Sequence, residues 1–222
     1  MEDIKQFKCV IFDMDGTLLY TTEDITKSLN LTLSFFGYPL HTEKEVESYL
    51  NNGAYKLVER ALPQDARDNE TVSKVLKKYL EIYNQHVCEK TCPYDGIYEL
   101  VKKLKESGIK IAVVSNKPDA QTKKLAVHCF GEGTFDYISG SGEGLPIKPD
   151  KECVFRATQS MGVDDMSEVL FVGDSCVDVL TAKNTGIKSA GVLWGFSGKA
   201  SFSEHKPDYY IDTAKTLEKI IL

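Results

Sequence analysis

The spacing of hydrophobic residues changes along the chain and predicts two kinds of structure. Residues 8–12 (KCVIF) form a short apolar run that leads into Asp-Met-Asp-Gly-Thr, a pattern typical of a buried strand followed by a turn. Between residues 23 and 87, apolar side chains instead recur every three or four positions, as at Ile25, Leu29 and Leu33, which predicts helices. A helical block therefore follows the first strand.

Within this block, a capping box formed by Thr42 and Glu45 predicts the start of one helix. Beyond the turn at residues 93–96, strand and helix patterns alternate, which predicts a parallel sheet. The expected strands lie near residues 109–114, 135–138, 169–172, 189–193 and 209–211. The predicted fold is α/β, with a Rossmann-like open parallel sheet formed by residues 1–18 and 90–222 and an inserted α-helical domain at residues 19–89.

The composition is that of a globular protein without nucleic-acid or membrane partners. Of the 222 residues, 42% are hydrophobic, and 27 Lys and Arg against 33 Asp and Glu give a net charge of −6. This charge repels DNA and anionic membranes, so a phosphate-bearing ligand needs a locally positive site.

The sequence contains no apolar run of membrane-spanning length and no signal-peptide pattern at its start, so a cytoplasmic protein is expected. The six cysteines include no CxxC pair and are expected to be reduced.

Polar side chains follow the expected strands at the points where these strands end. They are Asp13 and Asp15 after the first strand, Ser115 and Asn116 after the second, Lys148 before a later helix, and Asp174 and Asp178 after the strand near 169–172. Because ligands bind at the carboxyl ends of parallel strands, these residues are expected to converge on one edge of the sheet.

The residue types at this edge suit phosphoryl transfer. Two carboxylates at close range cannot both ionise easily, so Asp13 and Asp15 suggest one charged nucleophile and one protonated acid. Asp174 and Asp178 add oxygen ligands of the kind that favours Mg²⁺ over zinc or copper. Ser115 and Lys148 would bind phosphate oxygens. A calcium loop is disfavoured, because Leu18 stands where that loop needs glycine.

Four segments of the chain resemble, in order and spacing, the four motifs of the haloacid dehalogenase superfamily. They are DMDGTLL at 13–19, VVSNK at 113–117, KPD at 148–150 and GDSCVD at 173–178. The inserted helices resemble the helical cap of the phosphoglycolate phosphatase-like and β-phosphoglucomutase-like members. The resemblance covers essentially the whole chain.

This resemblance implies a role for each site residue. Asp13 would be the nucleophile that forms an aspartyl-phosphate, and Asp15 would protonate the leaving oxygen and later activate water. The implied Mg²⁺ ligands are Asp13, the backbone carbonyl of Asp15, and Asp174, with Asp178 in a supporting role. The implied phosphate-binding residues are Ser115, Asn116 and Lys148. Thr17 would orient Asp15 or its turn.

The resemblance implies a Mg²⁺-dependent phosphatase acting on a small phosphorylated metabolite, with 2-phosphoglycolate as one candidate. A carboxylate on the substrate would need a cation from the cap, and Lys56 or Arg60 could supply it, although a solvated helix face is the favoured explanation for each. We expect the cap to open and close through hinges near residues 19–23 and 87–93. The protein is expected to be a monomer or a homodimer.

Several other functions stay open at this point. A phosphomutase, a pyrophosphatase or a nucleotidase could use the same fold and the same acids. A non-catalytic phosphate-binding or phospho-acceptor protein could also present an acidic Mg²⁺ pocket. A dehalogenase is disfavoured, because such members typically lack the second acid, which is present here as Asp15.

Overall fold

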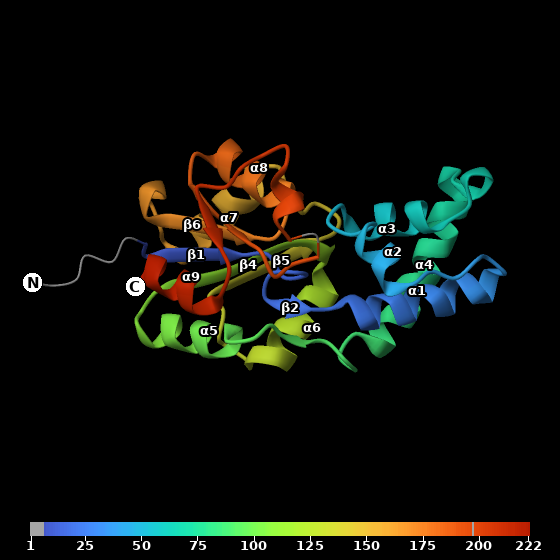
Figure 1. The fold of residues 1–222 in the computed structure, drawn as a ribbon, viewed down its shortest axis with the longest axis horizontal. Helices are drawn as coiled ribbons and strands as arrows, with labels where there is room; N and C mark the ends of the chain where they lie inside the picture. The colour runs from blue at the N-terminus through green and yellow to red at the C-terminus, as the bar shows by residue number, and fades with distance from the viewer. Residues whose placement is uncertain (1–6, 197) are drawn as a thin grey trace, which may run out of the picture.

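The computed structural model describes residues 7–196 and 198–222. The first six residues, which the sequence distinguishes from a signal peptide, lie outside this description. A sheet covered by helices forms one end of the molecule, next to the C-terminus, and a group of helices forms the other end (Figure 1). None of the helices in the described part of the chain is long and apolar enough to cross a membrane.

The central sheet has six strands in the order β5-β4-β1-β6-β7-β8, and all of its strand pairs are parallel. The strands are β1 (Cys9–Phe12), β4 (Lys110–Pro118), β5 (Tyr137–Ser141), β6 (Val169–Gly173), β7 (Lys188–Val192) and β8 (Tyr209–Ile211). Phe12 at the end of β1 pairs with Val113 of β4 and Val172 of β6, so the polar segments after these strands share one edge. The predicted open parallel sheet is confirmed.

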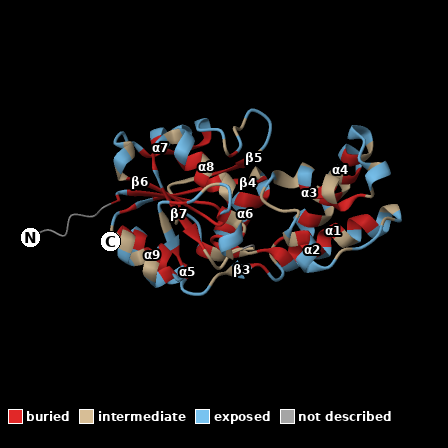
Figure 2. Cartoon of the chain, turned by 45° about the horizontal axis from the view of Figure 1, so that its top comes forward, coloured by how far each residue is buried: buried red, intermediate tan, exposed pale blue. Residues whose placement is uncertain are grey.

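Helices cover both faces of the sheet. Three of them, α5 (Ile97–Glu106), α6 (Asp119–Phe130) and α9 (Ala214–Ile221), lie on one face, and α7 (Glu152–Met161) and α8 (Cys176–Thr185) lie on the other (Figure 1). Val10 and Phe12 belong to the apolar cluster on the first face, whereas Cys9 and Ile11 belong to the cluster on the second. Alternate residues of β1 are therefore buried on opposite faces, which explains its uninterrupted apolar sequence. The strands are largely buried in Figure 2, and exposed positions lie on the outer helices.

The inserted block consists of α1 (Thr22–Phe36), α2 (Glu43–Glu47), α3 (Gly53–Ala61) and α4 (Asn69–His86), with a 3-10 turn at Gln64–Ala66. The predicted capping box is present, because the Thr42 side chain accepts from the Glu45 N–H and the Glu45 side chain accepts from the Thr42 N–H. The helices predicted between residues 23 and 87 are confirmed.

The two crossovers between the helical block and the sheet pair with each other. β2 (Leu19–Tyr20) and β3 (Cys92–Pro93) form an antiparallel two-stranded ribbon. The fully buried Asp24 of α1 fixes the returning chain, because its carboxylate accepts from the backbone N–H groups of Glu89, Lys90 and Thr91 at 2.9–3.1 Å. Both segments expected to act as hinges are therefore held in defined positions.

Candidate active site

The loop after β1 is tightly wound and brings Asp13 to the edge of the sheet. The backbone N–H of Asp13 donates to the Val172 carbonyl at 2.9 Å, and the Met14 N–H donates to Asp13 Oδ1 at 2.7 Å. Gly16 has a φ of +80°, and a Cβ there would lie 2.5 Å from Asp174 Oδ2. Only glycine fits this backbone conformation and this close approach, so the loop and Asp174 are held against each other.

Thr17 stabilises the same loop through its backbone. Its carbonyl accepts from the Trp194 indole N–H at 3.0 Å. Its buried hydroxyl finds no hydrogen-bond partner among the described residues. The structure therefore gives Thr17 no side-chain hydrogen bond to Asp15.

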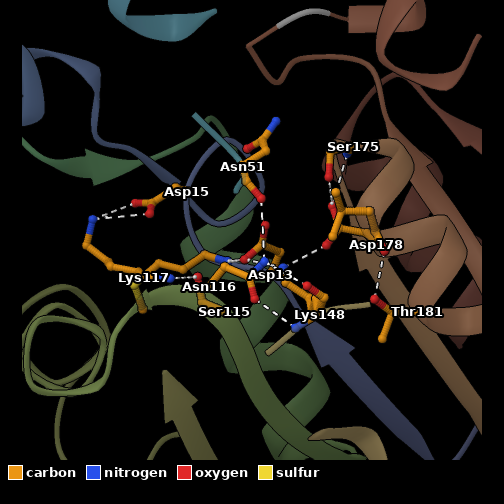
Figure 3. A network of polar contacts seen from close by, with 12 residues as sticks. Asp13, Asp15, Asn51, Ser115, Asn116, Lys117, Lys148, Ser175, Asp178 and Thr181 are labelled. Carbon is orange, nitrogen blue, oxygen red and sulfur yellow. Dashed lines mark hydrogen bonds and ion pairs between the residues drawn. The ribbon is translucent and has the colours of Figure 1, made fainter. Parts of the chain in front are cut away.

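Lys148 lies between two carboxylates in the interior of the site. Its ammonium is 2.8 Å from Asp13 Oδ1 and 2.7 Å from Asp178 Oδ1, and all three side chains are buried (Figure 3). Burial lowers the pKa of Lys148, but the charges of Asp13 and Asp178 together raise it above its ordinary value. Lys148 is thus a permanent cation at this position.

Asp13 itself has a raised pKa of about 6, mainly because it is buried, and Lys148 opposes this increase. The same factor acts on Asp174, whose pKa is raised well above its ordinary value by burial and by the charges of Asp178 and Asp13. Three carboxylates and one lysine therefore leave the site with an excess of buried negative charge.

A divalent cation fits this excess. Asp13, Asp174 and Asp178 each offer a carboxylate oxygen, and these atoms lie within 4.8 Å of one another. Asp174 Oδ1 is buried and has no hydrogen-bond partner among the described residues. By contrast, Asp178 Oδ2 already accepts from the Ser175 N–H and hydroxyl at 3.0 and 2.6 Å. A buried carboxylate oxygen without a hydrogen-bond partner, such as Asp174 Oδ1, is the type of ligand that hard cations bind in proteins.

The end of β4 carries Ser115 and Asn116, and the Asn116 side chain is used in holding Lys148. Its Oδ1 accepts from the Lys148 N–H at 2.8 Å and its Nδ2 donates to the Lys148 carbonyl at 3.0 Å. Ser115 lines the cavity described below, and its Oγ accepts from the Lys117 N–H at 3.3 Å. β4 continues to Pro118, farther than the sequence indicates, because these polar residues keep an extended backbone.

Lys117 is a site residue to which sequence reasoning gave no role. Its buried ammonium contacts Asp15 Oδ1 at 2.9 Å and Oδ2 at 3.1 Å, and it lies 4.7 Å from the centre of the Tyr83 ring of α4 (Figure 3 shows the ion pair). The residue stands inside the VVSNK segment, so a signal was present. Its partner Asp15 is 102 positions away in sequence, and only the fold brings them together.

These residues surround a small cavity of about 50 Å³ between the sheet edge and the inserted helices. The wall on the sheet side consists of Asp13, Asp15, Ser115, Asn116, Lys117, Pro118 and Lys148. The wall on the helical side consists of Ile25, Leu50, Asn51, Gly53, Ala54, Leu57, Tyr79 and Tyr83. The cavity therefore joins an ionic wall to an apolar and aromatic one.

Lys56 and Arg60 do not line this cavity. The Lys56 ammonium lies 2.5 Å from a Glu59 carboxylate oxygen on the exposed side of α3. The Arg60 guanidinium donates to the Tyr49 carbonyl at 2.9 Å and to Asn52 Oδ1 at 2.7 Å. Arg60 therefore fixes the loop before α3, and neither side chain is placed to meet a ligand in the cavity.

Comparison with known proteins agrees with this architecture. Residues 10–192 match the family model described as haloacid dehalogenase-like hydrolase. A phosphoglycolate phosphatase of Haemophilus influenzae is 31% identical over 223 aligned positions, covering 97% of this chain and 99% of that protein. Phosphoglycolate phosphatase 1 of Pseudomonas aeruginosa is 32% identical, covering 95% of this chain and 78% of its own length.

A solved structure has the same fold over the whole chain. The crystal structure of a predicted phosphoglycolate phosphatase from Haemophilus somnus has a TM-score of 0.90 and 26% sequence identity, and the match covers 99% of this chain and 100% of that one. The family match spans most of the chain and includes all four motif segments. The chain belongs to the haloacid dehalogenase-like hydrolase family.

Proposed function

We propose that the chain is a Mg²⁺-dependent phosphatase that hydrolyses a small phosphomonoester through an aspartyl-phosphate on Asp13, with 2-phosphoglycolate as the leading candidate substrate. One observation carries the proposal: the buried Asp13 lines the cavity, lies 2.8 Å from the Lys148 ammonium, and has a carboxylate oxygen within 4.8 Å of oxygens of Asp174 and Asp178. The names of the curated relatives support phosphomonoester hydrolysis and this substrate.

The carboxylates of Asp13 and Asp174 would hold the cation, together with the backbone carbonyl of Asp15, and Asp178 would support them. A bound Mg²⁺ supplies positive charge that offsets repulsion between these carboxylates and the phosphoryl oxygens. The buried and unpaired Asp174 Oδ1 supports this assignment.

Asp13 and Asp15 divide the chemistry. A carboxylate oxygen of Asp13 attacks phosphorus, and the bond from phosphorus to the ester oxygen breaks. Asp15 gives a proton to that departing oxygen, and later takes one from the water that attacks the aspartyl-phosphate, which releases phosphate and restores Asp13.

Lys148 and Ser115 would bind the phosphoryl oxygens. The Lys148 backbone is fixed by two hydrogen bonds to the Asn116 side chain, so its ammonium is held in place before the substrate arrives. Such preorganised charge stabilises a transition state more effectively than a mobile group does. We assign Asn116 to this positioning role, with its backbone N–H as a further donor to phosphate.

We propose that residues 19–89 act as a cap over a core formed by residues 1–18 and 90–222. The cavity supports this division, because one wall comes from the sheet edge and the other from the inserted helices. Closure of the cap would exclude water during the first step and place the substrate against Asp13.

The experiment is a phosphate-release assay on a panel of 2-phosphoglycolate, hexose phosphates, nucleoside monophosphates, pyrophosphate and an aryl phosphate, with and without Mg²⁺. Asp13→Asn removes the nucleophile, and Asp164→Asn makes the same change at an exposed position. We expect Mg²⁺-dependent turnover in the wild type and in Asp164→Asn, and a loss of at least about 10³-fold in Asp13→Asn.

Two outcomes would contradict the proposal. Isomerisation of a sugar phosphate without release of phosphate would identify a phosphomutase. A folded wild-type protein that turns over no member of the panel would identify a phosphate-binding or phospho-acceptor protein.

A further inference from the structure

The ionic wall of the cavity contains two cations among the described residues, Lys117 and Lys148. These two lysines differ in the number of carboxylates that they contact. Lys148 contacts two buried carboxylates, Asp13 and Asp178. Lys117 contacts one carboxylate, that of Asp15, whose side chain is 17% exposed. Lys117 is therefore the cation with capacity for a further anion.

Hydrogen-bond geometry gives the same result. An ammonium group has three N–H donors and no acceptor. The Lys117 ammonium donates to the two carboxylate oxygens of Asp15 at 2.9 and 3.1 Å, and it also lies over the Tyr83 ring. An aromatic face attracts the charge without using a directed hydrogen bond, so one donor remains for a ligand in the cavity.

The helical wall offers no competing cation. Its lining residues are apolar, aromatic or uncharged, and Lys56 and Arg60 are engaged elsewhere. Tyr83 lines the cavity, and its buried hydroxyl has no hydrogen-bond partner among the described residues. A second anionic group on a substrate would therefore find Lys117 and the Tyr83 side chain as its neighbours, beyond the phosphate-binding residues.

We propose that Lys117 is a specificity-determining residue that binds a second anionic group of the substrate, a carboxylate, through the donor that Asp15 does not use. The inference rests on the proposed phosphatase function. A substrate that carries only the phosphate would leave this donor without an anion. A substrate that also carries a carboxylate would accept from this donor, while Asp15 keeps its contacts with the same ammonium.

The test compares two substrates of the same size, 2-phosphoglycolate and 2-hydroxyethyl phosphate, which differ in having a carboxylate or a hydroxymethyl group. Lys117→Met removes the charge with little change in volume, and Lys117→Arg retains it. Lys123→Met is the matched control, because Lys123 is exposed and pairs with Asp119 on the surface of α6.

We expect Lys117→Met to lower kcat/KM for both substrates, because Asp15 loses its partner. The ratio of kcat/KM for 2-phosphoglycolate to that for 2-hydroxyethyl phosphate should fall by a further factor of about 10 to 100, the size of a charge-assisted hydrogen bond. The additional loss should lie in KM. Lys117→Arg should recover most of the ratio, and Lys123→Met should keep it.

An equal loss on both substrates would overturn the inference, because Lys117 would then act only by holding Asp15. If Lys117→Met does not fold, Lys117→Gln is measured in its place, since its amide keeps a donor to Asp15 without the charge. Failure of the proposed function has a different signature, in which the wild type itself hydrolyses neither substrate.

Discussion

At the scale of single residues, the site combines charges that would repel each other in the absence of a ligand. Asp174 is fully buried, and its pKa is raised by burial and by two neighbouring carboxylates. Groups placed in this way cost stability unless a cation compensates them. The same arrangement therefore predicts a metal site and a metal-dependent stability.

Removing Asp174 should separate these two effects. In wild-type protein, Mg²⁺ at about 100 times its dissociation constant should raise the melting temperature by about 5 to 10 °C. Asp174→Asn should show no such increase. Its melting temperature without Mg²⁺ should equal or exceed that of the wild type, because the variant lacks a buried carboxylate that Asp13 and Asp178 repel. Differential scanning calorimetry measures both values.

The exposed variant Asp164→Asn serves as the control and should respond to Mg²⁺ as the wild type does. Retention of the full Mg²⁺-dependent increase by Asp174→Asn would mean that the cation binds elsewhere.

At the scale of elements, the positions of α1 and α3 depend on a few polar contacts with neighbouring loops. Asp24 joins the first turn of α1 to residues 89–91, and Arg60 joins α3 to the loop at residues 49–52. These loops lie where the inserted helices meet the sheet edge or the cavity. Stability and catalysis should therefore respond together when either contact is lost.

Asp24→Ala should lower the free energy of unfolding by about 2 to 4 kcal/mol. The change leaves three backbone N–H groups without their acceptor in a partly buried place. Urea denaturation measures the loss, with the exposed Asp65→Ala as the control. A change below about 0.5 kcal/mol would show that water replaces the carboxylate and that the crossover does not depend on it.

Arg60→Met should lower kcat/KM and cost about 1 to 2 kcal/mol of stability, because the loop that carries Asn51 loses its hydrogen bonds. Lys56→Met should change kcat/KM by no more than about twofold and stability by less than about 0.5 kcal/mol, since Lys56 makes an exposed ion pair with Glu59 and an outer contact with the Tyr55 ring. Steady-state kinetics and urea denaturation distinguish the two variants. A larger kinetic loss in Lys56→Met than in Arg60→Met would instead support Lys56 as the cap's cation.

At the scale of the whole molecule, the sequence allowed prediction of the parts that repeat a simple pattern. The apolar run of β1 and the spacing of Ile25, Leu29 and Leu33 each reflect burial on known faces. The β2–β3 ribbon could not be predicted, because two-residue strands carry no periodicity. The pairing of Lys117 with Asp15 was equally inaccessible, since it depends on the order of strands in the sheet.

The proposed motion of the cap should be visible by hydrogen exchange. The Asn116 amide lies 3.5 Å from the Asn51 carbonyl, so the loop before α3 is one part of the cap that meets the core directly. Addition of Mg²⁺ and inorganic phosphate should slow amide exchange in residues 50–57 by about tenfold or more, because closure protects amides that open locally. The central strands β1 and β4 should change little, because they are already protected. Slowed exchange confined to the motif segments, with residues 50–57 unaffected while phosphate is bound, would show that the cap stays fixed and that the substrate enters without it opening.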